Sequence, residues 1–195
     1  MRTKSLALAA LTLLPALLSA AWAQPAFLVK DIGDAGSASR SPLWWLPSLR
    51  GGPAELDGAL YFPSDDGIHG VELWRSDGTA AGTRLVRDLC PGICASSLGS
   101  LAAFQHRIYW LSDQLWTSDG TPQGTAPFLN PESPAAASRL IPMGEAGGRL
   151  LLSGTTGQSS QGELWATDGT PAGTVRLRKF PAGPGSYSLR PALIG

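Results

Sequence analysis

The 195-residue chain contains few charged residues and few of the side chains that most often act as nucleophiles or hold metals. Charged residues make up 15% of the sequence, against about 25% in an average protein. The formal net charge is zero, so the basic excess typical of a nucleic-acid-binding protein is missing. There are two histidines, two cysteines and no G-x-S-x-G, H-E-x-x-H, P-loop or G-x-G-x-x-G motif, so no local pattern indicates a catalytic class.

Sustained helical periodicity is also missing after Ala23, which excludes long amphipathic helices. The chain is instead rich in turn residues, with 24 glycines and 16 prolines. Hydrophobic residues make up 43% of it and include seven tryptophans, which is enough to bury a core. The composition therefore favours a folded all-β protein with many short strands.

The first 23 residues have the three parts of a secretory signal peptide. A basic start, an apolar run over residues 5–20 and an A-x-A site at residues 21–23 follow one another, which predicts cleavage before Gln24. A membrane-spanning helix is the alternative, but it needs about 20 apolar residues, and Pro15 interrupts this shorter run. We therefore expect an exported chain with no membrane span after cleavage.

Cys90 and Cys94 are separated by a three-residue segment that contains a Pro-Gly pair. In an oxidising compartment such a turn can bring two thiols within disulfide range. A zinc site is less well supported, because structural zinc needs four ligands and only His69 and His106 could be added, neither at a ligand-like spacing. The sequence predicts a disulfide that stabilises one turn.

One twelve-residue phrase occurs three times, at residues 72–83, 114–125 and 163–174. Its common form is [EQ]-L-W-x-[ST]-D-G-T-x-x-G-T. The tryptophans of the three copies, Trp74, Trp116 and Trp165, lie 42 and 49 residues apart. Periods of this length are typical of propellers and solenoids.

Short apolar segments flank each copy, and with the Leu-Trp segment they predict four strands per unit. The segments that precede the phrase are residues 59–62, 107–111 and 149–152. The segments that follow it are residues 84–87, 126–129 and 175–178. The segments that open the next unit are residues 97–101, 138–141 and 188–190.

The predicted fold is a β-propeller-like array of four-stranded antiparallel blades that occupies residues 24–195. It has three full repeats and a partial strand at each end: a lone strand at 27–32, repeats at about 43–89, 97–130 and 138–180, and a partial repeat at 186–195. Three blades are fewer than the four to eight of known propellers, so we expect either a part of a longer repeat protein or an incomplete ring. Its unpaired β edges favour self-association.

The repeated polar residues are interpreted as structural. The set comprises Trp74, Asp77, Gly78, Thr79, Trp116, Asp119, Gly120, Thr121, Trp165, Asp168, Gly169 and Thr170. Asp-Gly favours a turn, because glycine adopts positive φ and the aspartate accepts nearby backbone N–H groups. Calcium is the alternative, but it needs six to eight oxygens and each phrase supplies one carboxylate. The tryptophans suit packing between blades, with a row of ligand-stacking rings as the alternative.

Two other groups are candidate ligand contacts. Trp44 and Trp45 lie outside the repeated positions, in a Pro-flanked insertion of the first unit. Asp65, Asp66 and His69 form the densest polar group of the chain and could bind a ligand or act in acid–base catalysis. The structural alternative for them is a loop in which Asp and Gly make the turn. The other two units lack this group.

The phrase E-L-W-x-x-D-G-T resembles the bacterial ELWxxDGT repeat family, which consists of exported multi-repeat proteins. The family unit is similar to L-V-K-D-I-x-P-G followed by L-Y-F-x-A-D-D-G-x-H-G-x-E-L-W-x-S-D-G-T-x-x-G-T. Residues 27–31 match its beginning, residues 60–83 most of the rest, and residues 84–92 the start of the next unit. Gln114 departs from the pattern, and the second and third units lack D-D-G-x-H-G.

The resemblance implies a β-propeller-like repeat protein that is periplasmic, on the cell surface or extracellular. It carries over no catalytic residue and no cofactor. We expect a non-catalytic scaffold that binds a protein, a glycan or a surface polymer, and not nucleic acid. The alternatives are a glycosidase-like propeller hydrolase and a non-functional fragment of a longer repeat protein.

Overall fold

The computed structural model describes residues 28–32, 52–92, 98–130, 135, 138–156 and 162–181. These residues form twelve strands and no α-helix. The strands make three four-stranded antiparallel sheets, one for each repeat. The prediction of an all-β chain with four-stranded antiparallel units is confirmed.

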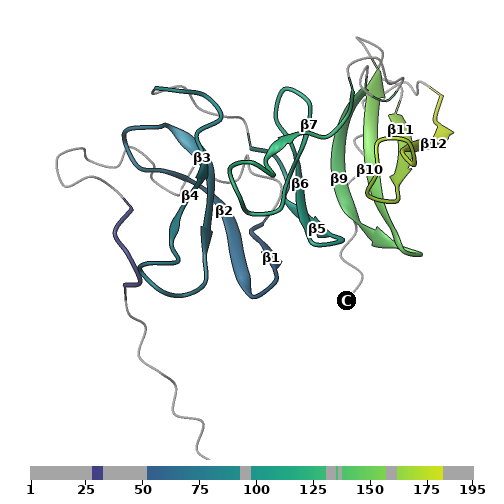
Figure 1. Ribbon diagram of the computed structural model, residues 1–195. Helices are drawn as coiled ribbons and strands as arrows, with labels where there is room; N and C mark the ends of the chain where they lie inside the picture. Colours follow the sequence, from purple (N-terminus) through teal and green to yellow (C-terminus); the bar gives the residue numbers. More distant parts are fainter. Residues whose placement is uncertain are drawn as a thin grey trace, which may run out of the picture.

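Each sheet contains four strands that neighbour one another in the order of the sequence. The first sheet contains β1 (Ala54–Leu56), β2 (Ala59–Asp65), β3 (Val71–Ser76) and β4 (Arg84–Arg87). The second contains β5 (Ala102–Phe104), β6 (Arg107–Leu111), β7 (Leu115–Ser118) and β8 (Ala126–Pro127). The third contains β9 (Ser138–Ala146), β10 (Arg149–Thr156), β11 (Gly162–Thr167) and β12 (Val175–Lys179). Figure 1 shows the three sheets in a row, in sequence order.

Two-residue turns join the first two strands of every sheet. They are formed by Asp57-Gly58, Gln105-His106 and Gly147-Gly148, and all six residues have positive φ. This conformation fits type I′ hairpins, whose twist matches that of the flanking strands. The Asp-Gly pair of the repeated phrase does not form such a turn, because it begins a seven-residue connection between the third and fourth strands of each sheet.

The opening strands of the first two sheets differ from the sequence prediction. The second sheet opens at β5, and residues 98–101, which were expected to form this strand, lie just before it. The reason is the two-residue turn at residues 105–106, because it pairs Phe104 directly with Arg107. The first sheet opens with β1, a three-residue strand that hydrophobic patterning did not identify.

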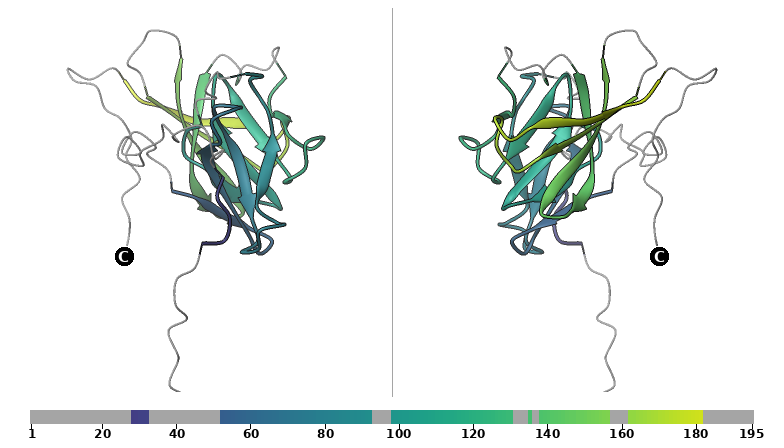
Figure 2. Two further views of the ribbon diagram at one scale, coloured as in Figure 1. Left: turned by 90° about the vertical axis from the view of Figure 1, so that its left-hand side faces the viewer. Right: turned by 90° about the vertical axis from the view of Figure 1, so that its right-hand side faces the viewer.

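The hydrophobic core lies between the sheets. Two clusters of buried side chains fill the two spaces, as expected for sheets that pack face to face. The first includes Tyr61, Leu73 and Val86 of the first sheet with Ile108 and Trp110 of the second. The second includes Tyr109, Leu115 and Phe128 of the second sheet with Leu140, Leu150, Leu152 and Trp165 of the third. Viewed along the row, the sheets overlap one behind another (Figure 2).

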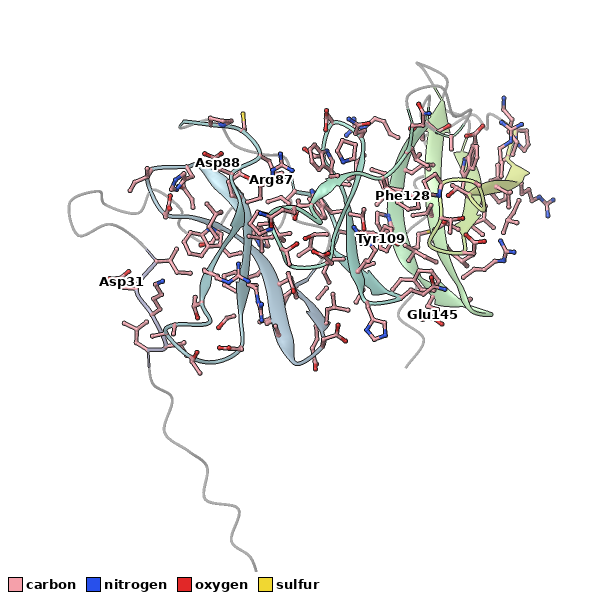
Figure 3. All side chains as sticks on the ribbon, in the orientation of Figure 1. Asp31, Arg87, Asp88, Tyr109, Phe128 and Glu145 are labelled. Carbon is pink, nitrogen blue, oxygen red and sulfur yellow. The ribbon has the colours of Figure 1, made fainter. Side chains whose placement is uncertain are left out.

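Alternation along β6 connects the two clusters. Ile108 and Trp110 point toward the first sheet, whereas Tyr109 between them points toward the third. The ring of Tyr109 meets that of Phe128 edge to face, with the ring centroids 5.2 Å apart. Both lie on the side of the second sheet that faces β9 (Figure 3). The second sheet is therefore covered on both faces by its neighbours.

Candidate functional site

The Asp and Thr of the repeated phrase bond to each other in all three loops. In the second loop, the backbone N–H and the hydroxyl of Thr121 donate to Asp119 Oδ1 at 2.9 and 2.7 Å. Asp77 accepts the same two bonds from Thr79, and Asp168 accepts them from Thr170. The threonine hydroxyl and N–H lower the pKa of each aspartate, because they stabilise its charged form. These carboxylates therefore hold their own turn.

A second set of hydroxyls closes each loop. Ser118 Oγ lies 2.7 Å from Thr125 Oγ1 and accepts the N–H of Gly120, while the Thr125 hydroxyl donates to the carbonyl of Thr121. The first loop has the same bonds around Ser76 and Thr83. In the third loop Thr167 takes the place of serine and bonds Thr174. All four conserved polar positions of the phrase thus serve loop geometry.

The second glycine of the phrase lies directly beneath the aspartate carboxylate. A Cβ on Gly82, Gly124 or Gly173 would overlap the carboxylate of Asp77, Asp119 or Asp168, respectively. In each loop this glycine also donates its N–H to the hydroxyl of the first threonine, at 2.9 Å. The glycine is therefore required for close approach of a side chain and not for positive φ.

Gly124→Ala is expected to lower the free energy of unfolding by about 1–3 kcal/mol, because the methyl group forces the Asp119 carboxylate out of the loop. The loss should shrink in an Asp119→Ala background, in which the overlap is removed. Gly52→Ala is the control, because nothing lies within 4 Å of a Cβ there. Equal losses in urea denaturation of the single variants at Gly124 and Gly52 would contradict this account.

The repeated tryptophans lie in the sheets and not in a common exposed row. Trp74 and Trp165 are buried, and Trp116 is half-buried. The ring of Trp116 stacks on Trp110, with the centroids 6.2 Å apart and the planes at 19°. Arg176 lies over the ring of Trp165, with its guanidinium carbon 5.8 Å from the centroid.

The loop between β2 and β3 holds the candidate contacts Asp65, Asp66 and His69. Asp65 Oδ1 accepts the N–H of Gly67 at 2.8 Å. Asp66 Oδ1 accepts the N–H groups of Ile68 and His69, and its other oxygen lies 2.7 Å from His69 Nδ1. Asp66 is buried, whereas the imidazole is partly exposed. The structure brings Asp66 and His69 together and leaves Asp65 as a turn residue beside them.

Both members of this pair have shifted pKa values. The hydrogen bond to Asp66 raises the pKa of His69, and the negative charges of Asp66, Asp88 and Glu72 act in the same direction against partial burial. Burial opposes ionisation of Asp66, but the N–H groups and imidazole of His69 and the N–H of Ile68 outweigh it and lower the pKa of Asp66. The arrangement favours a charged pair, in which the bond at Nδ1 orients the imidazole ring.

Sequence reasoning did not include Glu72 and Asp88 in this group. Glu72 is fully buried at the start of β3, and its Oε1 accepts the N–H of Cys90 at 3.1 Å. Asp88 directly follows Arg87 at the end of β4 (Figure 3). A signal was present, since Val86-Arg87-Asp88 repeats the pattern of Val29-Lys30-Asp31. Pairing of β4 with β3 brings this end of the strand toward the loop.

Several predicted features lie outside the described residues. They are the signal peptide at residues 1–23, the candidate contacts Trp44 and Trp45, the second cysteine Cys94 and the partial repeat at 186–195. The disulfide therefore stays a prediction. Within the described ranges no helix is long and apolar enough to cross a membrane, and no group of three or more His, Cys, Asp or Glu side chains could hold a metal ion.

Comparison of the sequence with protein-family models and with curated proteins finds no match.

Proposed function

We propose that the protein is an exported, non-catalytic repeat scaffold that binds a protein, a glycan or a surface polymer at or outside the cell surface. The observation that supports the proposal most directly is that the repeated polar residues bond to one another. In three loops, Asp, both Thr and the Ser or Thr before Asp bond to one another. Polar residues that stabilise the loops of each repeat are typical of a structural framework, in which every unit packs on its neighbours.

A propeller-like arrangement is part of this proposal. Contacts link β1 with β5 and β5 with β9, so the opening strands of successive sheets are neighbours. The last strands, β4, β8 and β12, are sheet edges. Opening strands near a common axis and last strands at the rim are the arrangement of propeller blades. The resemblance to ELWxxDGT repeats and the signal-peptide pattern support export.

The Asp66–His69 loop is the proposed ligand contact among the described residues. The sequences of the other two repeats have no such Asp-x-x-His group, and the loop presents a partly exposed imidazole held by a buried carboxylate. The same pair favours the second candidate function, a hydrolase, because a carboxylate that orients an imidazole is a common acid–base arrangement.

A binding assay with two matched histidine variants tests the proposal. The purified chain is applied to isolated peptidoglycan sacculi and to a glycan array, and its affinity is compared with those of His69→Ala and His106→Ala. His106 is a suitable control, because it also pairs with an aspartate, Asp57 at 3.0 Å, but on an exposed turn. We expect His69→Ala to weaken binding by about tenfold or more and His106→Ala to leave it unchanged.

Two outcomes would count against the scaffold. Wild-type protein that binds neither sacculi nor any glycan would exclude glycans and peptidoglycan as ligands. Turnover of a panel of chromogenic glycosides that is lost in His69→Ala with unchanged circular dichroism would establish the hydrolase instead. Trp44→Ala and Trp45→Ala in the same assay test the other predicted contacts.

A further inference from the structure

The internal repeat allows equivalent positions in the three sheets to be compared. Val86, Phe128 and Leu177 each lie three residues after the threonine that ends the phrase. Val86 is 1% exposed and Phe128 7%, because each packs into the cluster shared with the next sheet. Leu177 is 54% exposed. The third sheet thus presents, at this position, a surface that the first two sheets bury.

Other residues on the same side of the third sheet follow this pattern. Leu151 and Leu164 are half-buried, while the equivalent Tyr109 and Leu115 of the second sheet are buried in the core. Ile141 on β9 is exposed. The trailing face is defined here as Ile141, Leu151, Leu164 and Leu177.

The first sheet presents the complementary surface on its opposite side. Leu60 and Phe62 are equivalent to Ile108 and Trp110, the two residues by which the second sheet packs on the first. Both equivalents are 0% exposed, whereas Leu60 is 43% exposed and Phe62 is half-buried. The leading face is defined here as Leu60 and Phe62. Trp74, the cross-strand partner of Phe62, lies on the same side and is 6% exposed, so the exposed part of this side is the part around Leu60 and Phe62. Leading faces pack on trailing faces at both sheet–sheet contacts within the chain.

A cationic side chain beside the contact between the first two sheets donates to backbone carbonyls of the next phrase. Arg87, after Val86, donates to the carbonyls of Thr125 at 2.5 Å and of Pro122 at 3.5 Å in the next phrase. Lys30, which has the same place in the pattern Val29-Lys30-Asp31, donates to the carbonyl of Thr83 at 2.8 Å. Arg178 has the equivalent place on β12, where its guanidinium lies over the ring of Phe180.

The charges of the two ends of the row are complementary. Residues 52–92 of the first repeat contain seven acidic and three basic side chains. Residues 138–156 and 162–181 of the third repeat contain three acidic and five basic ones. A contact between the third sheet of one chain and the first sheet of another is therefore favoured by long-range attraction as well as by apolar burial.

We propose that the trailing face of the third sheet binds the leading face of the first sheet in a second copy of this chain. The contact repeats, between chains, the stacking that already joins the sheets within one chain. Arg178 of one copy then takes the place of Lys30 at the Thr83 carbonyl of the other. Because two different faces meet, the interface is heterologous and generates a ring or an open array. It is independent of ligand binding by the His69 loop.

Sedimentation velocity and light scattering of the purified chain over a concentration series, up to about 100 μM, test this interface. We expect a mass above that of one chain, which rises with concentration and falls with added salt. Leu177→Asp and Leu60→Asp should each weaken self-association by about tenfold or more, because each places a charge in an apolar contact. Ile68→Asp is the control, since Ile68 is also 54% exposed but belongs to neither face.

Mixing the two face variants distinguishes a heterologous contact from a symmetric one. Leu177→Asp retains an intact leading face, and Leu60→Asp retains an intact trailing face. We expect each to be monomeric alone and the equimolar mixture to form a one-to-one dimer that grows no further. Lys30→Ala should strengthen self-association, because it removes the competitor of Arg178. A wild-type chain that stays monomeric, a mixture that forms no dimer, or equal weakening by Ile68→Asp would overturn the proposal.

Discussion

Replacement of Trp165 with alanine is expected to lower the free energy of unfolding by about 3–5 kcal/mol. The indole is buried in the cluster that joins the second and third sheets, and its N–H donates to Glu163 Oε2 at 2.9 Å. The ring lies against Gly154, where a Cβ would come within 3.0 Å of the indole. Removal of the ring leaves a cavity that the rigid strands around it cannot fill. Urea denaturation of the purified chain measures the loss.

Trp116→Ala is the matched control for this change. It removes the same side chain from the equivalent position of the second sheet, but Trp116 is half-buried and its N–H bonds Asp113 at the surface. We expect a distinctly smaller loss, because less apolar area leaves water at this position on folding. Losses of equal size at Trp116 and Trp165 would show that burial between the sheets does not set the cost.

The second large effect is expected at Glu163. The side chain is fully buried, and it accepts bonds from the Ser138 hydroxyl and the Trp165 indole while pairing with Arg176 at 3.0 Å. Glu163→Ala leaves these donors without their acceptor, which should cost about 3 kcal/mol in the free energy of unfolding. The value is at the low end for a broken buried pair, because the Arg176 side chain is half exposed and can turn to water.

Two further variants, Glu163→Gln and Glu145→Ala, test the expected cost of Glu163→Ala. With its carbonyl oxygen in the place of Oε2, glutamine retains the acceptor for the indole and the hydroxyl, but it loses the charge and the acceptor that faces Arg176, so its cost should lie below that of alanine. Glu145 is exposed on β9, and its replacement should change stability by no more than about 0.5 kcal/mol. If Glu163→Ala costs no more than Glu145→Ala in urea denaturation, the buried carboxylate does not organise this end of the sheet.

The same repeat position has different partners in the other sheets. Glu72 binds the backbone N–H of Cys90, whereas Glu163 binds Arg176 on the neighbouring strand. The residues equivalent to Arg176 are Leu85 and Pro127, which cannot form an ion pair. A shared phrase therefore sets the position of the polar group, and the neighbouring strand decides its partner. For this reason the ion pair could not be predicted from the repeat.

The structure of the Asp-Gly-Thr loops could be predicted from the sequence only in part. An Asp-Gly pair indicates a turn in which the carboxylate accepts N–H groups, and Asp119 does so from Thr121. The bond between Ser118 and Thr125 joins the two ends of the connection, seven residues apart. It depends on the path of the loop, as does the placement of Gly124 beneath the carboxylate. Neither follows from local propensity.

At the Asp66–His69 loop, sequence spacing identified the group, because Asp and His three residues apart can share one turn. It did not identify Glu72 and Asp88, whose charges act on His69 because β3 and β4 pair beside the loop. Residues from different strands meet only when the sheet forms.

Repetition in the amino-acid sequence was sufficient to define three β units, their turn-rich loops and most of their strands, since phrase and flanking patterns recur in the chain. It could not show which apolar faces are covered. Successive side chains of a strand point to opposite faces, so strands with apolar residues at consecutive positions give each sheet two apolar faces. Ile108 and Leu60 have equivalent places in their units, yet one is buried and the other exposed. Stacking decides this difference: the second sheet has a sheet on either side, whereas in the described part of the chain the first and third sheets each pack against one.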